Sequence, residues 1–78
     1  MRYYIYYWTK SDITEYENDY GEFDLLPNLY SSLIQYGSLI GKTNSEEEAY
    51  KICDNKADKM RYDECILIWD SYEKRWFN

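Results

Sequence analysis

Two segments of this chain are apolar on both faces of an extended strand, and they constrain the fold more than any other feature. Residues 2–10 combine tyrosines with isoleucine, tryptophan and threonine, the residue types favoured in β-strands. The segment Cys65 to Trp69 is apolar throughout. Together they predict two central strands of one sheet that is covered on both faces. Because successive strand side chains point to opposite faces, the faces of the first strand carry Tyr3, Ile5 and Tyr7, and Tyr4, Tyr6 and Trp8.

The clearest helix signal begins at Ser45, which forms a capping-box pattern with Glu48. Three glutamates at the start and three basic residues toward the end suit the helix dipole, so we expect a helix from Glu46 to Arg61. Apolar side chains recur along it at three- and four-residue spacing, which predicts one face that packs on the sheet. These residues are Ala49, Ile52, Cys53, Ala57 and Met60.

Shorter elements complete the predicted fold. Leu39 and Ile40 form a short strand, residues 75–77 pair back on Cys65 to Trp69 as a final strand, and residues 28–35 form a short helix after Pro27. We therefore expect a single α+β domain over residues 1–78, with a sheet of about four strands in the chain order strand, strand, helix, strand, strand and one main helix packed on one face. A parallel pair of strands around that helix implies a right-handed crossing.

The second face of the sheet also needs cover. Either the segment Leu25 to Tyr36 folds over it, or tyrosines and tryptophans stay exposed there as a contact surface.

Motifs for catalysis, metals and cofactors fail at specific positions. Gly41-Lys42-Thr43 resembles the end of a phosphate-binding loop, but Tyr36 stands where the pattern requires glycine. The chain has no histidine, so its two cysteines lack a catalytic base and the usual partners of a structural zinc ion. Asp54-x-Lys56-x-Asp58 places a lysine where calcium needs an oxygen ligand. We expect no enzymatic activity and no cofactor.

The sequence also indicates where the protein acts. Tyrosines replace the aliphatic core of a signal peptide at the amino terminus, and no apolar run approaches the roughly 20 residues of a membrane-spanning helix. Cys53 and Cys65 are therefore expected as reduced core thiols of a soluble, cytoplasmic protein that does not bind membranes. The net charge of −6 repels phosphate backbones and disfavours direct binding of nucleic acid.

All of this net charge comes from one stretch, Asp12 to Asp24, which holds six acids and no base, while the other nine acids equal the nine bases. If the stretch is extended, Glu15, Glu17 and Asp19 project on one side about 6.6 Å apart, comparable to successive phosphates of a nucleic-acid strand. The alternative is a mobile solvated loop that keeps the protein soluble. The candidate partner-binding residues are Asp12, Glu15, Tyr16, Glu17, Asp19, Tyr20, Glu22 and Asp24.

In length, concentrated acidity and its 11 tyrosines, the chain resembles the small acidic proteins that bacteriophages and mobile elements encode against host defence, including anti-CRISPR proteins and other DNA mimics. This resemblance implies an inhibitor that occupies the basic nucleic-acid-binding site of a partner protein such as an effector nuclease, in the host cytoplasm if the chain is phage-encoded. The alternative is an adaptor or self-associating structural module that uses an aromatic sheet surface or an open strand edge, which predicts a homo-oligomer such as a homodimer.

Overall fold

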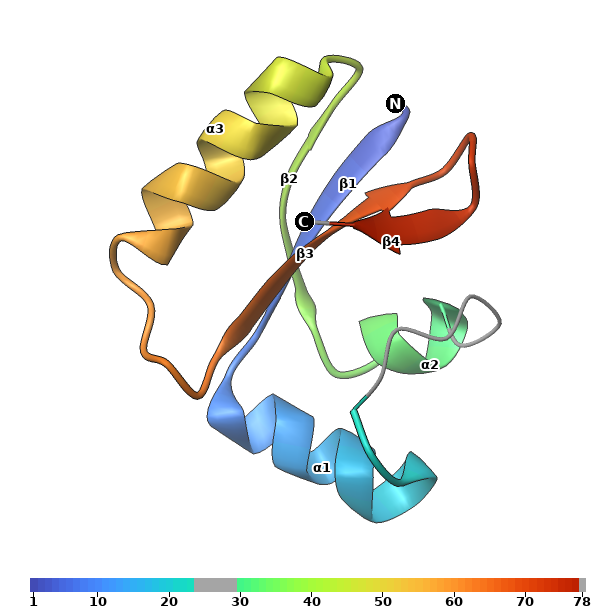
Figure 1. Ribbon diagram of the computed structural model, residues 1–78. Coiled ribbons are helices and arrows are strands. Elements are labelled where there is room, and N and C mark those ends of the chain that lie inside the picture. The colour runs from blue at the N-terminus through green and yellow to red at the C-terminus, as the bar shows by residue number, and fades with distance from the viewer. Residues whose placement is uncertain (24–29, 78) are drawn as a thin grey trace.

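The fold is α+β, as predicted, and is described from a computed structural model over residues 1–23 and 30–77. Within these described residues, four strands form one sheet and three helices lie around it (Figure 1). The elements in chain order are β1 (Tyr3–Trp8), α1 (Lys10–Tyr20), α2 (Tyr30–Ile34), β2 (Ser38–Thr43), α3 (Glu46–Ala57), β3 (Cys65–Asp70) and β4 (Arg75–Phe77).

The two strands that are apolar on both faces occupy the centre of the sheet. The strand order is β2-β1-β3-β4, and every neighbouring pair is antiparallel. The β1–β3 ladder runs without interruption from Tyr3 opposite Asp70 to Trp8 opposite Cys65. Because β2 and β3 both run antiparallel to β1, they are parallel to each other with β1 between them, and α3 connects them across one face (Figure 1).

Helix α3 covers the first face, as its apolar stripe predicts. Ser45 caps it by accepting the Glu48 backbone N–H, and Ala49 and Cys53 are buried against Ile5 and Ile68. The helix ends at Ala57 rather than Arg61, because the chain tightens there into three-residue turns before entering β3. Met60 still packs on the sheet, whereas Ala57 is exposed, contrary to the predicted stripe.

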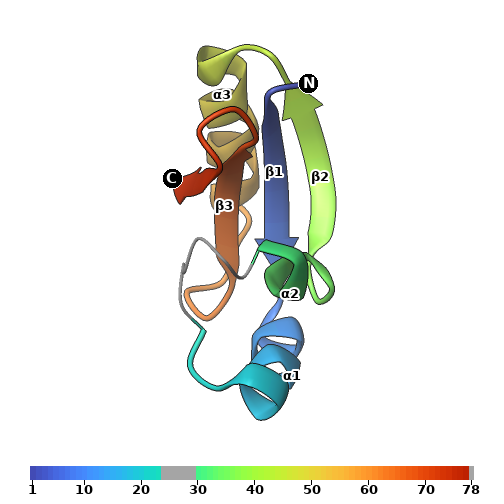
Figure 2. The same cartoon turned by 90° about the vertical axis from the view of Figure 1, so that its right-hand side faces the viewer.

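The second face is covered by the chain itself, so its aromatic side chains do not form an open contact surface. Leu33 of α2 and Tyr16 of α1 are fully buried in one cluster with Trp8, Trp69 and other residues of the sheet. The Trp8 indole N–H donates to the Leu33 carbonyl at 2.9 Å. Figure 2 shows α2 on the side of the sheet opposite α3. Of the predicted cover, Tyr30–Ile34 lies here and residues 25–29 fall outside the described residues; the contribution of α1 was not predicted.

An ion pair joins the amino terminus to the β3–β4 turn. The Arg2 guanidinium donates two hydrogen bonds to the Asp70 carboxylate, at 3.0 and 2.9 Å, and lies between the rings of Tyr3 and Tyr72. Asp70 is buried and also accepts the backbone N–H groups of Tyr72 and Glu73. These hydrogen bonds, that of Arg2 above all, lower the pKa of Asp70 to about 2.

The two cysteines are free, and they lie on opposite faces of the sheet. Among the described residues, none of the helices has the length and apolar character that crossing a membrane requires.

Candidate functional site

The acidic stretch begins as a helix, which corrects the extended row and the mobile loop considered from the sequence. Helix α1 starts immediately after β1, because Thr9 accepts the Asp12 backbone N–H at 3.1 Å and Asp12 accepts that of Thr9 at 2.9 Å. Ile13, Tyr16 and Tyr20 recur at three- and four-residue spacing; Ile13 and Tyr16 pack into the cluster on the second face of the sheet, and Tyr20 stacks on Tyr16. A capping box followed by this short apolar stripe was the signal that could have predicted the helix.

The helix separates the carboxylates that an extended chain would have aligned. Asp12, Glu15 and Asp19 are three and four residues apart, so they share one side of α1, which we call the acidic flank. Glu17 lies on another side, and Glu22 follows the helix end at Gly21. The rise between Glu15 and Asp19 is about 6 Å, one helical turn. A short acidic row therefore remains, with different members from the one predicted.

The positions of three α1 carboxylates are fixed by hydrogen bonds. Asp12 is held by the capping box, and Glu17 accepts the backbone N–H of Phe23 at 3.4 Å. Asp19 accepts a hydrogen bond from the Tyr36 hydroxyl, and the sequence did not indicate Tyr36 as part of this site. This hydrogen bond is the main reason that the pKa of Tyr36 is raised to about 12.

The basic residues do not neutralise the acidic flank. Within the described part of the chain, ion pairs join Arg2 to Asp70 and Glu73, and Lys51 to Glu47 and Glu48. None of these pairs involves α1. The carboxylates of the flank therefore keep their charge available to a partner.

The tyrosines of the predicted contact surface differ in their exposure. Tyr16 is fully buried and cannot touch a partner, which corrects its assignment. Tyr20 is 48% exposed and stacks on the Tyr16 ring at a centroid distance of 5.2 Å, so a rigid aromatic face lies on α1 beside the acids. Asp24 falls outside the described residues.

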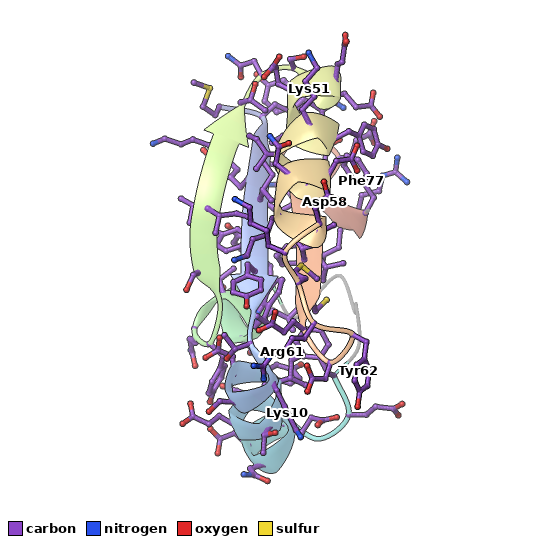
Figure 3. The ribbon with its side chains drawn as sticks, turned by 90° about the vertical axis from the view of Figure 1, so that its left-hand side faces the viewer. Lys10, Lys51, Asp58, Arg61, Tyr62 and Phe77 are labelled. Atoms are coloured by element: carbon purple, nitrogen blue, oxygen red, sulfur yellow. The ribbon has the colours of Figure 1, made fainter. Side chains whose placement is uncertain are left out.

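A second group of charged and aromatic residues lies where α3 leads into β3. Figure 3 labels Arg61 and the fully exposed Tyr62 in this connection, close to Lys10 at the start of α1 in this view. Nearby, the Lys56 ammonium lies 4.1 Å from the centroid of the Tyr7 ring, and the Tyr7 hydroxyl donates to Glu64 at 2.5 Å. Cations and carboxylates are therefore mixed in this connection, whereas α1 beyond Lys10 carries acids and no base.

The described residues contain no pocket and no group of three side chains suited to hold a metal ion. The sequence matches no protein-family model, and neither curated proteins nor solved structures give a significant match.

Proposed function

We propose that this protein is a non-enzymatic inhibitor or mimic whose acidic flank, with Glu17, Tyr20 and Glu22, occupies a basic nucleic-acid-binding surface of a partner protein. The observation that carries the proposal is the concentration of the whole formal charge of −6 in residues 12–24, where none of the ion pairs found among the described residues reaches. Charge gathered in this way produces a directional field that steers a cationic partner.

The spacing of the acidic flank supports a partner that binds phosphates. Along α1 the rise from Asp12 to Glu15 is about 4.5 Å and from Glu15 to Asp19 about 6 Å. These steps are of the same order as the separation of phosphates along a nucleic-acid strand, so arginines and lysines placed for phosphates can meet these carboxylates. Tyr20 adds a flat face on which a guanidinium group can stack.

In this proposal the partner is a protein such as an effector nuclease, and the site of action is the cytoplasm, that of the host cell if the chain is phage-encoded. The negative charge argues against direct contact with nucleic acid. The resemblance to small acidic inhibitors of host defence supports the same assignment through the length, acidity and tyrosine content of the chain.

The competing adaptor function loses its expected surface. The aromatic face of the sheet is one of the two surfaces expected for an adaptor, but Trp8, Trp69 and Trp76 are buried beneath α1, α2 and Phe23. The other, an open strand edge, is present at β2 and can join two copies without replacing the acidic surface. We therefore retain the inhibitor as the proposed function.

The test is capture of partner proteins from the native cell or its phage-infected host on the immobilised chain, at low and at high salt. We expect recovery of a nucleic-acid-processing enzyme at low salt, its loss at high salt, and its displacement by an oligonucleotide. The proposal is contradicted if high salt and the oligonucleotide both leave the amount of captured partner unchanged. It is also contradicted if no nucleic-acid-binding protein is captured at low salt.

A further inference from the structure

Strand β2 forms an open edge of the sheet. It pairs with β1 on one side, and no described element pairs with its other side (Figure 2). A six-residue strand at an edge presents unpaired backbone N–H and C=O groups that can add another strand. The opposite edge, β4, is only three residues long and offers a much shorter ladder.

The side chains of β2 leave this edge weakly protected. Leu39 is 48% exposed and Ile40 is 36% exposed, and they lie next to each other in the middle of the strand. Edge strands usually avoid pairing through proline, several charges or bulges. Here there is no proline, Lys42 is the one charged residue, and the register shift against β1 near Ile40 is the one irregularity.

We propose that β2 pairs antiparallel with β2 of a second copy of this chain, which joins two four-stranded sheets into one. Antiparallel pairing of identical strands places a two-fold axis near the middle of β2, close to Ile40. Leu39 and Ile40 of both copies then gather around the axis and lose their exposure to water. Lys42 lies two residues from Ile40, so the two copies of Lys42 are not directly opposite each other.

Charge complementarity across the same axis favours a second copy of this chain as the partner that pairs with β2. Helix α3 contacts β2, β1 and β3, so it is centred over β1. In the dimer the two α3 helices run antiparallel on one face, about three strand spacings or 14 Å apart. The first turn of α3 carries Glu46, Glu47 and Glu48, and its last turn and the residues after it carry Lys56, Lys59 and Arg61. Each acidic end therefore faces the basic end of the other copy.

This interface is separate from the proposed inhibitory surface. Helix α1 lies beyond one end of the sheet, and the outer edge of β2 lies along its side (Figures 1 and 2). A dimer through β2 therefore leaves both acidic flanks open and presents two of them in one particle, which strengthens binding to a partner with two sites.

The first test is sedimentation equilibrium of the full chain over a range of concentrations. We expect a monomer–dimer equilibrium in the wild type and a dimer dissociation constant raised about tenfold or more by Leu39→Lys, because two lysines then meet near the axis. The matched control is Tyr72→Lys, which replaces a side chain that is 72% exposed in the β3–β4 turn, and it should dimerise like the wild type. Circular dichroism of each variant shows whether the monomer stays folded.

The second test traps the contact covalently. Under mild oxidation, Ile40→Cys should form a disulfide-linked dimer, whereas Tyr72→Cys should not, and this readout does not depend on a loss of folding. A wild type that remains monomeric at all concentrations, or a dimer that Leu39→Lys leaves intact and Ile40→Cys does not trap, overturns the proposal. Either result leaves the salt-dependent capture through α1 unaffected, so the two proposals fail separately.

Discussion

The Tyr36 hydroxyl donates a hydrogen bond to the Asp19 carboxylate, and this contact ties the acidic flank of α1 to the residues that lead into β2. Tyr36 also packs edge-on against Tyr16 and Tyr20, so one side chain contacts the buried side of α1 and one of its acids. Helix α1 and its acidic flank are therefore fixed to the rest of the fold through Tyr36. The orientation of its charges follows from the fold.

Replacing Tyr36 with phenylalanine tests this contact. The ring packing stays while the hydrogen bond to Asp19 is lost, so we expect the midpoint of unfolding to move to a slightly lower urea concentration. Urea unfolding measures the change. Tyr62→Phe is the matched control, since its side chain is fully exposed and the substitution should leave stability unaltered. Equal midpoints for all three proteins would show that the Tyr36 bond contributes nothing.

We predict that replacing Gly37 with any larger residue lowers the stability of the protein. A Cβ atom at this position would lie 2.7 Å from the Trp8 ring, which is fully buried and hydrogen-bonded to Leu33. Gly37→Ala therefore forces the ring or the backbone to move, and we expect a loss of about 2 kcal/mol in the free energy of unfolding. Trp8 lies in a dense aromatic cluster, so a changed near-ultraviolet circular dichroism spectrum should accompany the loss. An unchanged spectrum and stability would contradict this packing.

The Arg2–Asp70 ion pair should make stability fall in acid. The pKa of Asp70 is lowered from 3.8 to about 2, so its contribution is fully present above pH 4 and is lost as the pH falls toward 2. Asp70→Asn should lower the free energy of unfolding at pH 7 by about 2 kcal/mol and flatten its decline between pH 4 and 2. Chemical denaturation at a series of pH values checks this. If the variant loses stability in acid as steeply as the wild type, the decline in the free energy of unfolding comes from other carboxylates.

Both cysteine thiols should be unreactive in the native protein. Burial raises the pKa of Cys53 and of Cys65 to about 11, which leaves little thiolate at neutral pH. We expect alkylation by iodoacetamide at pH 7.5 to become fast only when denaturant unfolds the chain, as followed by mass spectrometry. Fast labelling of either thiol without denaturant would show that this part of the core opens readily.

The sheet and its main helix were predictable because local patterns determine them. Residues 3–8 and 65–69 have no polar face, so only central strands suit them. The Ser45 cap and the acids that follow it mark the start of α3, and basic residues mark the region of its end. The predicted end of α3 at Arg61 lies beyond the observed end at Ala57, because the turns that follow Ala57 depend on where β3 must begin.

The candidate site was less predictable, since its conformation depends on tertiary packing. The α1 segment has one buried residue, Tyr16, and its dense charge hid the apolar spacing that makes it helical. The sequence correctly shows that the acids gather in one stretch, but only the packing of Tyr16 determines which of them share a side. The Tyr36–Asp19 contact spans 17 residues and has no local signal.

The most direct test of the inhibitor proposal compares two variants that each lose four negative charges. The first neutralises the region around the acidic flank with Glu15→Gln, Glu17→Gln, Asp19→Asn and Glu22→Gln. The matched control neutralises exposed acids elsewhere with Glu47→Gln, Asp54→Asn, Asp58→Asn and Glu73→Gln. Isothermal titration measures the affinity of each for the partner recovered in the capture experiment at low salt.

We predict that the first variant binds about a hundredfold more weakly than the wild type while the control loses tenfold or less, because only the first removes the charges that face the partner. Equal affinity of the two variants would contradict the assignment of the binding surface to α1.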